Sequence, residues 1–235
     1  MNSERKTVII VGVLFIIATV SSIVGTFGFI DSILSDPDYL ISAFENKTQL
    51  ILGILIDAIN SIAVVVIAVM LFPIFRKHNE ALAIGYVGSR IIESVILIVG
   101  HISLFSLLSL SQEYVQGGTM GTSSLLPLGN LLLMVNDWTW LLGPTIVFSI
   151  TALILNYMLF QTRLVPRFLS VWGLIGAILM LTAGLFGIFN LSTTLTIAIF
   201  LGIPLALQEM VFAVWLIVKG FNSSVIGSGS ANIDR

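Results

Sequence analysis

Long apolar runs separated by short polar segments dominate the sequence. An α-helix needs about 20 consecutive apolar residues to cross the hydrocarbon core of a bilayer, and six runs reach that length. They predict membrane-spanning helices at about 7–30, 50–75, 81–110, 129–160, 168–189 and 195–218. We therefore expect an all-α, polytopic membrane protein. Its six-transmembrane-helix bundle should form a single domain over residues 1–220, followed by a Ser, Gly and Asn-rich disordered cytoplasmic tail at 221–235.

Composition agrees with this interpretation and narrows the partners. Of the 235 residues, 57% are hydrophobic and 9% are charged, whereas ordinary soluble domains contain about 25% charged residues. The ten Lys and Arg residues are scattered singly or in pairs, so they provide no basic surface for phosphates, and nucleic acid is not an expected partner. The absence of Cys excludes disulfides, thiolate metal sites and thiol nucleophiles. Composition thus implies the lipid bilayer as a partner.

The distribution of basic residues between the predicted loops sets the expected orientation. Eight Lys and Arg residues fall on one side of the spans and one falls on the other, and an excess of such residues marks the cytoplasmic side. The eight are Arg5, Lys6, Arg76, Lys77, Arg163, Arg167, Lys219 and Arg235, and the one is Lys47. The loops on the side of Lys47 carry the carboxylates Asp31, Asp36, Asp38, Glu45 and Glu113. Both termini are therefore expected to be cytoplasmic, with the chain in the cell (plasma) membrane.

Ionisable residues form a stripe on the third span. Arg90, Glu93, Leu97 and His101 are spaced three, four and four residues apart, so at about 100° per residue they share one helix face. A charge near the centre of a bilayer costs roughly 2.5 to 3.5 kcal/mol and persists only where polar groups or water meet it. The stripe should therefore face the interior of the bundle, with Arg90 paired with Glu93 or Glu209.

Depth along the helices sorts the polar residues into two levels. At about 1.5 Å per residue from the span ends, Arg90, Glu93 and Glu209 lie near the middle of the bilayer. Nearer the outside come Asp57, His101 and Asp137, which we expect to converge on one water-filled cavity covered by a loop at 111–128. The predicted ligand or ion pathway comprises Asp57, Asn60, Arg90, Glu93, His101, Asp137, Gln208 and Glu209.

Proline and small residues predict irregular and closely packed helices. Pro144 and Pro204 should kink the fourth and sixth spans, because a proline ring frees the carbonyl four residues earlier, at Trp140 and Phe200. A smooth edge for close packing is expected on the fifth span at Gly173, Ala177, Gly184 and Gly187.

Catalytic and metal-binding motifs are weak or missing. His101 with Ser103 and Ser106 is the only local arrangement of a base beside hydroxyls, and neither GxSxG nor GxxxxGK[ST] occurs. Asp57, His101 and Asp137 have side chains that can bind a divalent metal, but a single His without HExxH spacing does not predict a metal site. We therefore expect neither a metal nor a cofactor.

Three segments resemble a known family. They are SRIIES at 89–94, RLVPRFLSVWGLIGA at 163–177 and PLALQEMVFAVWLIVKGFN at 204–222. They are similar to an uncharacterised, mainly bacterial integral-membrane family, domain of unknown function 4386, and the resemblance covers nearly all of the chain. It implies a six-helix membrane protein without an assigned activity. The recurrent segments of the family include Arg90, Glu93, Arg163, Pro166, Trp172 and Glu209.

The sequence leaves several functions open. The buried Arg and carboxylates can simply fix helix register, and the outer carboxylates can be water-bonded groups of a structural vestibule. Alternatively, they bind a small solute, a proton or a cation in a transporter, which Pro-kinked helices and excess intramembrane carboxylates favour. The chain is also compatible with a membrane-embedded enzyme acting on lipid, or with an accessory or sensory membrane protein that has no catalytic site. The sequence does not indicate an oligomeric state.

Overall fold

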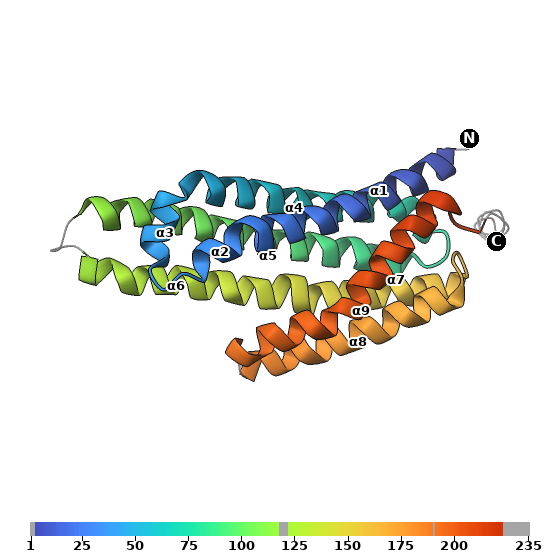
Figure 1. The fold of residues 1–235 in the computed structure, drawn as a ribbon. Coiled ribbons are helices and arrows are strands. Elements are labelled where there is room, and N and C mark those ends of the chain that lie inside the picture. Colours follow the sequence, from blue (N-terminus) through green and yellow to red (C-terminus); the bar gives the residue numbers. More distant parts are fainter. Residues whose placement is uncertain (1–2, 118–121, 190, 223–235) are drawn as a thin grey trace.

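The computed structural model describes residues 3–117, 122–189 and 191–222, which form helices joined by short turns (Figure 1). The α-helices and two π-helical segments are α1 Ser3–Ile23, η1 Val24–Ile30, α2 Asp31–Leu34, α3 Tyr39–Glu45, α4 Lys47–Phe75, α5 Glu80–Gln116, α6 Thr122–Trp140, η2 Leu141–Val147, α7 Phe148–Thr162, α8 Arg167–Phe189 and α9 Leu191–Val218. The expected tail from residue 223 onward lies outside the described residues.

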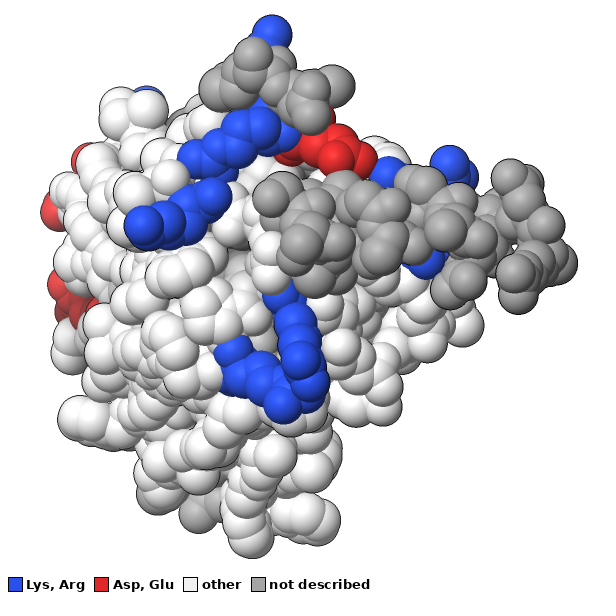
Figure 2. All heavy atoms as spheres, turned by 90° about the vertical axis from the view of Figure 1, so that its right-hand side faces the viewer, with Lys and Arg blue, Asp and Glu red and all other residues white. Residues whose placement is uncertain are grey.

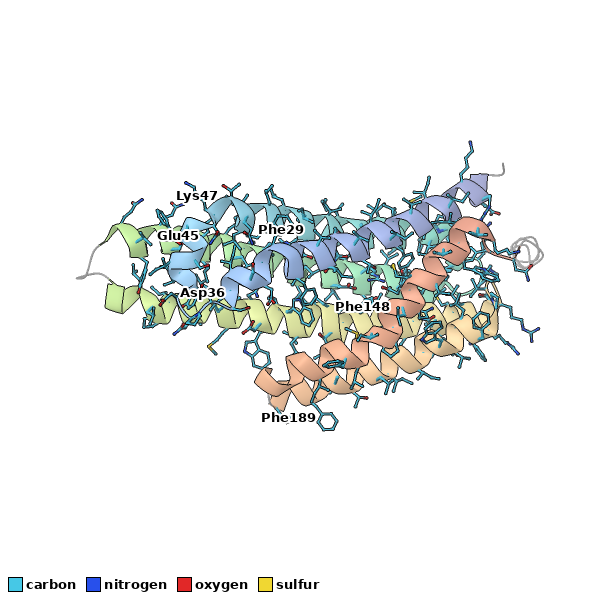
Figure 3. All side chains as sticks on the ribbon, in the orientation of Figure 1. Phe29, Asp36, Glu45, Lys47, Phe148 and Phe189 are labelled. Atoms are coloured by element: carbon cyan, nitrogen blue, oxygen red, sulfur yellow. The ribbon has the colours of Figure 1, made fainter. Side chains whose placement is uncertain are left out.

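Six helices in the described part of the chain are long and apolar enough to cross a membrane, as the sequence predicted. They are Glu4–Leu34, Lys47–Phe75, Glu80–Gln116, Leu125–Thr162, Arg167–Phe189 and Phe200–Val218. Large apolar side chains cover their outer faces: Ile62 is 65% exposed, and Phe189, which projects from the bundle in Figure 3, is 88% exposed. Such an exterior suits lipid and not water. The chain is therefore an all-α, multi-pass membrane protein.

Two boundaries differ from those expected. The loop predicted at 111–128 is shorter, because α5 continues to Gln116 and α6 begins at Thr122. Hydropathy marks where a chain leaves the bilayer, whereas a helix can continue into the headgroup region. At the other boundary, Phe221 is buried in the core and the backbone N–H of Asn222 donates to the carbonyl of Leu164 at 2.9 Å. The packed chain thus extends past residue 220.

Two apolar clusters lie toward opposite ends of the bundle. The larger joins α1, α4, α5, α7, α8 and α9 through side chains such as Phe15, Phe75 and Phe212. The smaller joins η1, α2, α3, α4 and α5, and includes Leu40 and Leu104. Along α4 and α5, the buried ionisable residues fall between the segments that supply these clusters. The polar groups therefore occupy the middle of the bundle, between the two apolar clusters.

A close helix crossing positions the outer polar residues. Gly25 of η1 lies against α4, where an added Cβ would be only 2.8 Å from both the backbone N of Asp57 and the carbonyl of Gly53. Facing it, a Cβ on Gly53 would be 2.7 Å from the Cβ of Phe29. Only glycine at both positions permits this approach, because the obstructing atoms are backbone atoms or Cβ atoms that cannot rotate away. The crossing fixes the height and rotation of Asp57.

The small-residue edge expected on the fifth span is buried. Its members, Gly173, Ala177, Gly184 and Gly187, lie in the interior of the bundle. At Gly173 an added Cβ would overlap the side chain of Asn156 on α7, and at Gly184 it would be 2.8 Å from Ile146 of η2. The prediction of close packing along this edge is thus confirmed.

The first and last helices meet at one end of the bundle, together with the α4–α5 and α7–α8 turns (Figure 1). We call this the basic end, because it carries Arg5, Lys6, Arg76, Lys77, Arg163, Arg167 and Lys219. Figure 2 views this end and shows several groups of Lys and Arg side chains on it, with acidic side chains beside one of them. Arg5 donates to the carbonyls of Leu216 and Ile217 at 2.7 Å and of Val218 at 3.0 Å. These bonds cap the free carbonyls of α9 and tie the helix ends together.

The opposite end is acidic. It carries Asp31, Asp36, Asp38, Glu45 and Glu113, and in Figure 3 Asp36 and Glu45 lie there together with the cation Lys47. The segregation of charge that the sequence predicted is therefore a feature of the fold.

Both prolines predicted to bend helices lie inside helical segments. Pro144 is in η2, a π-helical turn, and the carbonyl of Trp140 accepts a hydrogen bond from the Thr145 hydroxyl at 3.4 Å. Pro204 lies inside α9, which changes direction along its length in Figure 1. The other π-helical segment, η1, contains no proline, and no sequence pattern predicted it.

Candidate functional site

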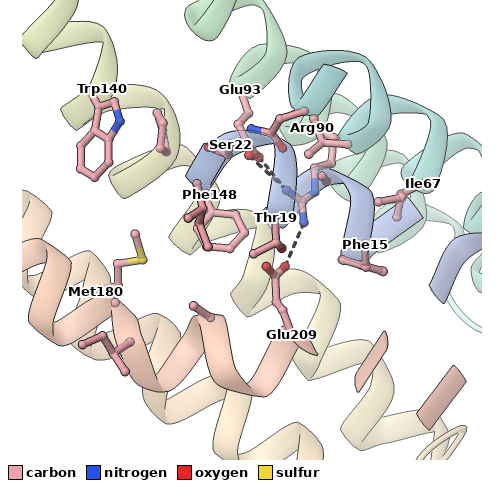
Figure 4. A pocket seen from close by; sticks show the side chains of 18 of the residues that line it. Phe15, Thr19, Ser22, Ile67, Arg90, Glu93, Trp140, Phe148, Met180 and Glu209 are labelled. Carbon is pink, nitrogen blue, oxygen red and sulfur yellow. Dashed lines mark hydrogen bonds and ion pairs between the residues drawn. The ribbon is translucent and has the colours of Figure 1, made fainter. Parts of the chain in front are cut away.

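The middle of the bundle holds a cluster of three charged side chains, Arg90, Glu93 and Glu209. Arg90 is 1% exposed, and its Nη1 lies 3.1 Å from each carboxylate oxygen of Glu93, one turn along α5. Its Nη2 lies 3.5 Å from Oε1 of Glu209 on α9. Figure 4 shows the guanidinium between the two carboxylates. The sequence predicted a pair with one of these residues, and the structure has both.

Aromatic rings complete the surroundings of Arg90. The guanidinium carbon lies 5.2 Å from the ring centroid of Phe148 and 5.7 Å from that of Tyr86. Ring faces carry negative electrostatic potential, so both contacts favour a cation in this position. Arg90 is therefore held as a charged group by contacts from α5, α7 and α9.

The two carboxylates are not equivalent. Both oxygens of Glu93 contact Arg90, and its side chain is 4% exposed. Glu209 approaches through one oxygen at the longer distance, and its side chain is 12% exposed. Glu93 is therefore the main counter-ion of Arg90, whereas Glu209 retains an oxygen that other groups can reach.

Glu209 lines a cavity of about 300 Å³, which we call the main cavity. Each of the six spans contributes to its wall, and aromatic or aliphatic side chains predominate. Its polar lining residues are Arg90, Glu93, Glu209, Asn60, Thr19 and Ser22. Ile23, Phe27 and Ile203 also line it and are 52%, 49% and 46% exposed, so the cavity reaches the bundle surface between the first helix and α9.

A second pair lies further toward the acidic end. Nε2 of His101 on α5 is 2.8 Å from Oδ2 of Asp57 on α4, and both residues are buried. The other carboxylate oxygen, Oδ1 of Asp57, has no hydrogen-bond partner within the described protein. The pair borders a small cavity of about 40 Å³ that Asn136 and Thr139 also line. His101 and Asp57 thus converge as the sequence predicted.

Asp137 does not join this pair. It lines a separate cavity of about 270 Å³, which we call the outer cavity and which Asp31 and Ser35 border at the acidic end. Its neighbour Asn136 lines both this cavity and the one at His101. Successive helical residues point about 100° apart, so the amide rather than the carboxylate faces His101. The convergence expected of Asp57, His101 and Asp137 is therefore wrong for Asp137.

Asn60 and Gln208 have different environments. Asn60 lines the main cavity, whereas Asp57, one turn earlier on α4, lines the small cavity at His101. Gln208 does not line it, and instead donates to Oδ1 of Asn156 and to the carbonyl of Leu169, both at 3.2 Å. These bonds link α9 to α7 and α8. The sequence placed Gln208 in the predicted ligand or ion pathway beside Glu209. In the structure its side chain instead links helices, which is a structural role.

Trp140 was missed as a site residue. It lines the main cavity, the outer cavity and the cavity at His101, and Phe27 lines the first two. Trp140 directly precedes η2, and Phe27 lies within η1. π-helical turns inside α-helices occur frequently at functional sites. The position of Trp140 four residues before Pro144 was the available sequence signal, because proline perturbs the preceding turn.

The structure also tests the weak catalytic and metal candidates. The Ser103 hydroxyl donates to the carbonyl of Leu132 at 2.6 Å, and that of Ser106 donates to the carbonyl of Ile102 at 2.8 Å. Both hydroxyls thus bond to the backbone instead of to His101. Across residues 3–117, 122–189 and 191–222, no three His, Asp or Glu side chains gather closely enough to hold a metal ion.

These features define a multi-pass helical membrane protein with a charged cavity inside its helix bundle. The chain belongs to the family described as Domain of unknown function (DUF4386), whose sequence model matches residues 10–220. Comparisons with curated proteins and with solved structures find no match. The resemblance noted in the sequence is therefore confirmed, and any function has to be argued from the cavity.

Proposed function

We propose that this protein is a proton-linked carrier of a small solute, with the main cavity as its binding site. The observation that carries the proposal is the excess of carboxylates over cations among the side chains that line this cavity. Arg90 supplies one positive charge against the carboxylates of Glu93 and Glu209. An unbalanced charge in apolar surroundings is costly, so the surplus negative charge favours binding of a proton or a cation.

The arrangement of the cavities supports a route to this site from the acidic end. The outer cavity begins beside the exposed residues Asp31 and Ser35 and shares Trp140 and Phe27 with the main cavity. Toward the basic end, packed side chains of the larger apolar cluster, including Phe15 and Phe212, close the bundle. A site reachable from one side and closed on the other is the arrangement that alternating access requires.

Proton movement in proteoliposomes tests the proposal. Vesicles with a trapped pH-sensitive dye would be exposed in turn to amino acids, sugars, carboxylates and organic cations. We expect one class to drive proton movement through the wild type. Glu209→Gln should abolish that movement because it removes the exchangeable carboxylate, whereas Glu113→Gln, at an exposed residue of the acidic end, should leave it unchanged. Wild-type vesicles that respond to none of the four classes would contradict transport.

We also infer that the basic end faces the cytoplasm and that the protein resides in the plasma membrane. The excess of Lys and Arg at that end supports this orientation. Reporter fusions after Arg76 and Arg163 should be active in the cytoplasm, and a fusion after Gly118 should be active outside. The opposite pattern of activity would show that the bundle is inverted.

A further inference from the structure

We propose that the main cavity binds a hydrophobic monocation, an organic amine or quaternary ammonium ion, in exchange for a proton on Glu209. This inference rests on the proposed function, because it names the solute class that the same site would carry. It follows from three properties of the cavity: its net charge, the chemistry of its walls and its position in the bundle.

The net charge favours a cation over an anion or a neutral solute. Around Glu209, α5 contributes the ionisable residues Arg90, Glu93 and Tyr86. Among the described residues that line the cavity, those from α1, η1, α4, α6, η2, α7 and α8 include no ionisable side chain. With both carboxylates ionised and Tyr86 neutral, the site carries one negative charge. A single positive charge on the ligand therefore neutralises it.

The walls favour an organic cation over an inorganic ion. Four aromatic side chains, Phe15, Phe27, Trp140 and Phe148, line the cavity. Aromatic faces bind alkylammonium groups, as in the cages that recognise quaternary ammonium ligands. Inorganic cations such as Ca²⁺ instead require about 6 to 8 oxygen ligands. Three of the four carboxylate oxygens already contact Arg90. Among the described lining residues, the side-chain oxygens that remain are the second oxygen of Glu209 and those of Thr19, Ser22 and Asn60, which are too few to replace such a hydration shell.

The position of the cavity suits a ligand that partitions into membranes. Its opening lies between the first helix and α9, where Ile23 and Ile203 are about half exposed on an apolar surface. A hydrophobic cation concentrates at the lipid interface and can reach this opening from the bilayer. The volume of the main cavity, about 300 Å³, is in the range of small-molecule sites. The apolar part of the ligand would pack against the aromatic side chains of the cavity, while its positively charged group would contact Glu209.

A proton and the organic cation should compete for Glu209, because the site carries one net negative charge and either of them is sufficient to neutralise it. Binding of the cation then releases about one proton, and reciprocity requires the apparent Kd to increase by up to about tenfold for each unit of pH decrease in the range where Glu209 is protonated. This linkage separates specific binding from partitioning into detergent, which does not depend on the protonation of one carboxylate.

Isothermal titration calorimetry with benzyltrimethylammonium tests the inference. Purified full-length protein in detergent would be titrated at mildly alkaline and mildly acidic pH, in two buffers of different ionisation enthalpy to count released protons. We expect saturable binding that weakens at acidic pH, with release of up to about one proton per cation at the acidic pH, where Glu209 is protonated before the cation binds. Phenylacetate, an anion of similar size, should not bind.

Three variants assign the binding to the cavity. Glu209→Gln should lose the pH dependence and weaken binding at least tenfold, whereas Glu113→Gln should bind as the wild type does. Ala206→Phe should weaken binding by filling the cavity, since Ala206 lines it, without changing any charge. Because this variant keeps the charge cluster, it tests the site even if Glu209→Gln does not fold.

Binding that is independent of pH in the wild type, or equal in the wild type and Ala206→Phe, would overturn the inference. The inference would also be wrong if benzyltrimethylammonium failed to bind while another solute drove proton movement that depends on Glu209. In that case the proposed function as a proton-linked carrier would stand. If the cation bound with proton release but no solute moved protons across vesicles, the inference would hold and the carrier function would fall.

Discussion

Replacing Arg90 by Ala is expected to lower the free energy of unfolding by about 3 to 5 kcal/mol, the usual cost of removing one partner from a buried ion pair. Arg90 is the only cation that contacts Glu93 and Glu209 among the described residues, and the Glu93 side chain is 4% exposed. Without Arg90, both carboxylates must be protonated or remain buried and unpaired. The loss should appear as a large decrease in the unfolding midpoint in detergent.

A matched triple variant separates the charge effect from the loss of packing. Arg90→Met combined with Glu93→Gln and Glu209→Gln removes every charge of the cluster while retaining side-chain volume. Replacing a complete buried ion cluster by neutral groups is often close to neutral, so we expect its stability to be within about 1 kcal/mol of the wild type. Equal stability of Arg90→Ala and the wild type would mean that hydration, and not the contact with Arg90, stabilises the two carboxylates.

Replacing Gly25 by Val is expected to destabilise the protein by about 3 kcal/mol, at the upper end of the usual cost of overpacking. An added Cβ would lie 2.8 Å from the backbone N of Asp57 and from the carbonyl of Gly53. Backbone atoms cannot rotate away, so η1 and α4 must separate. The separation would also shift Asp57, which is 2.8 Å from Nε2 of His101.

Gly28→Val provides the control, because Gly28 lies in the same segment η1. A Cβ there would meet only Cγ1 of Val24, at 3.9 Å. We expect its effect to be within about 0.5 kcal/mol, as for substitutions away from packed features. Unfolding midpoints of the two variants, measured side by side in detergent, make the comparison. Similar midpoints for both would show that the close crossing at Gly25 is not required.

The number and approximate positions of the spans could be predicted because the bilayer sets them. Its thickness of about 30 Å requires a minimum apolar length, and that length is visible in a single sequence. The face of α5 that carries Arg90, Glu93 and His101 was predictable for a similar reason, since buried charges recur with the helical period. The helix ends were less predictable. Gln116 and the preceding polar residues continue α5 outside the apolar stretch, where helix geometry no longer depends on hydropathy.

Rotation of one helix against another could not be predicted from periodicity. On α6, Asn136 rather than Asp137 borders the cavity of His101, although the two are adjacent in sequence. On α9, Glu209 reaches Arg90 while Gln208 bonds to Asn156. A rotation of one residue step, about 100°, exchanges the members of each pair, and the crossings of neighbouring helices decide which member faces inward.

The sequence by itself determined that this protein is an all-α bundle of membrane-spanning helices with buried charges near its middle, because both features follow from hydropathy and helical period along a single chain. Only the tertiary structure decided that Glu93 is the main partner of Arg90, that Glu209 faces a cavity, and that three cavities meet at Trp140. These relations depend on distances between helices, which close contacts such as those at Gly25 and Gly53 fix and which no local pattern encodes.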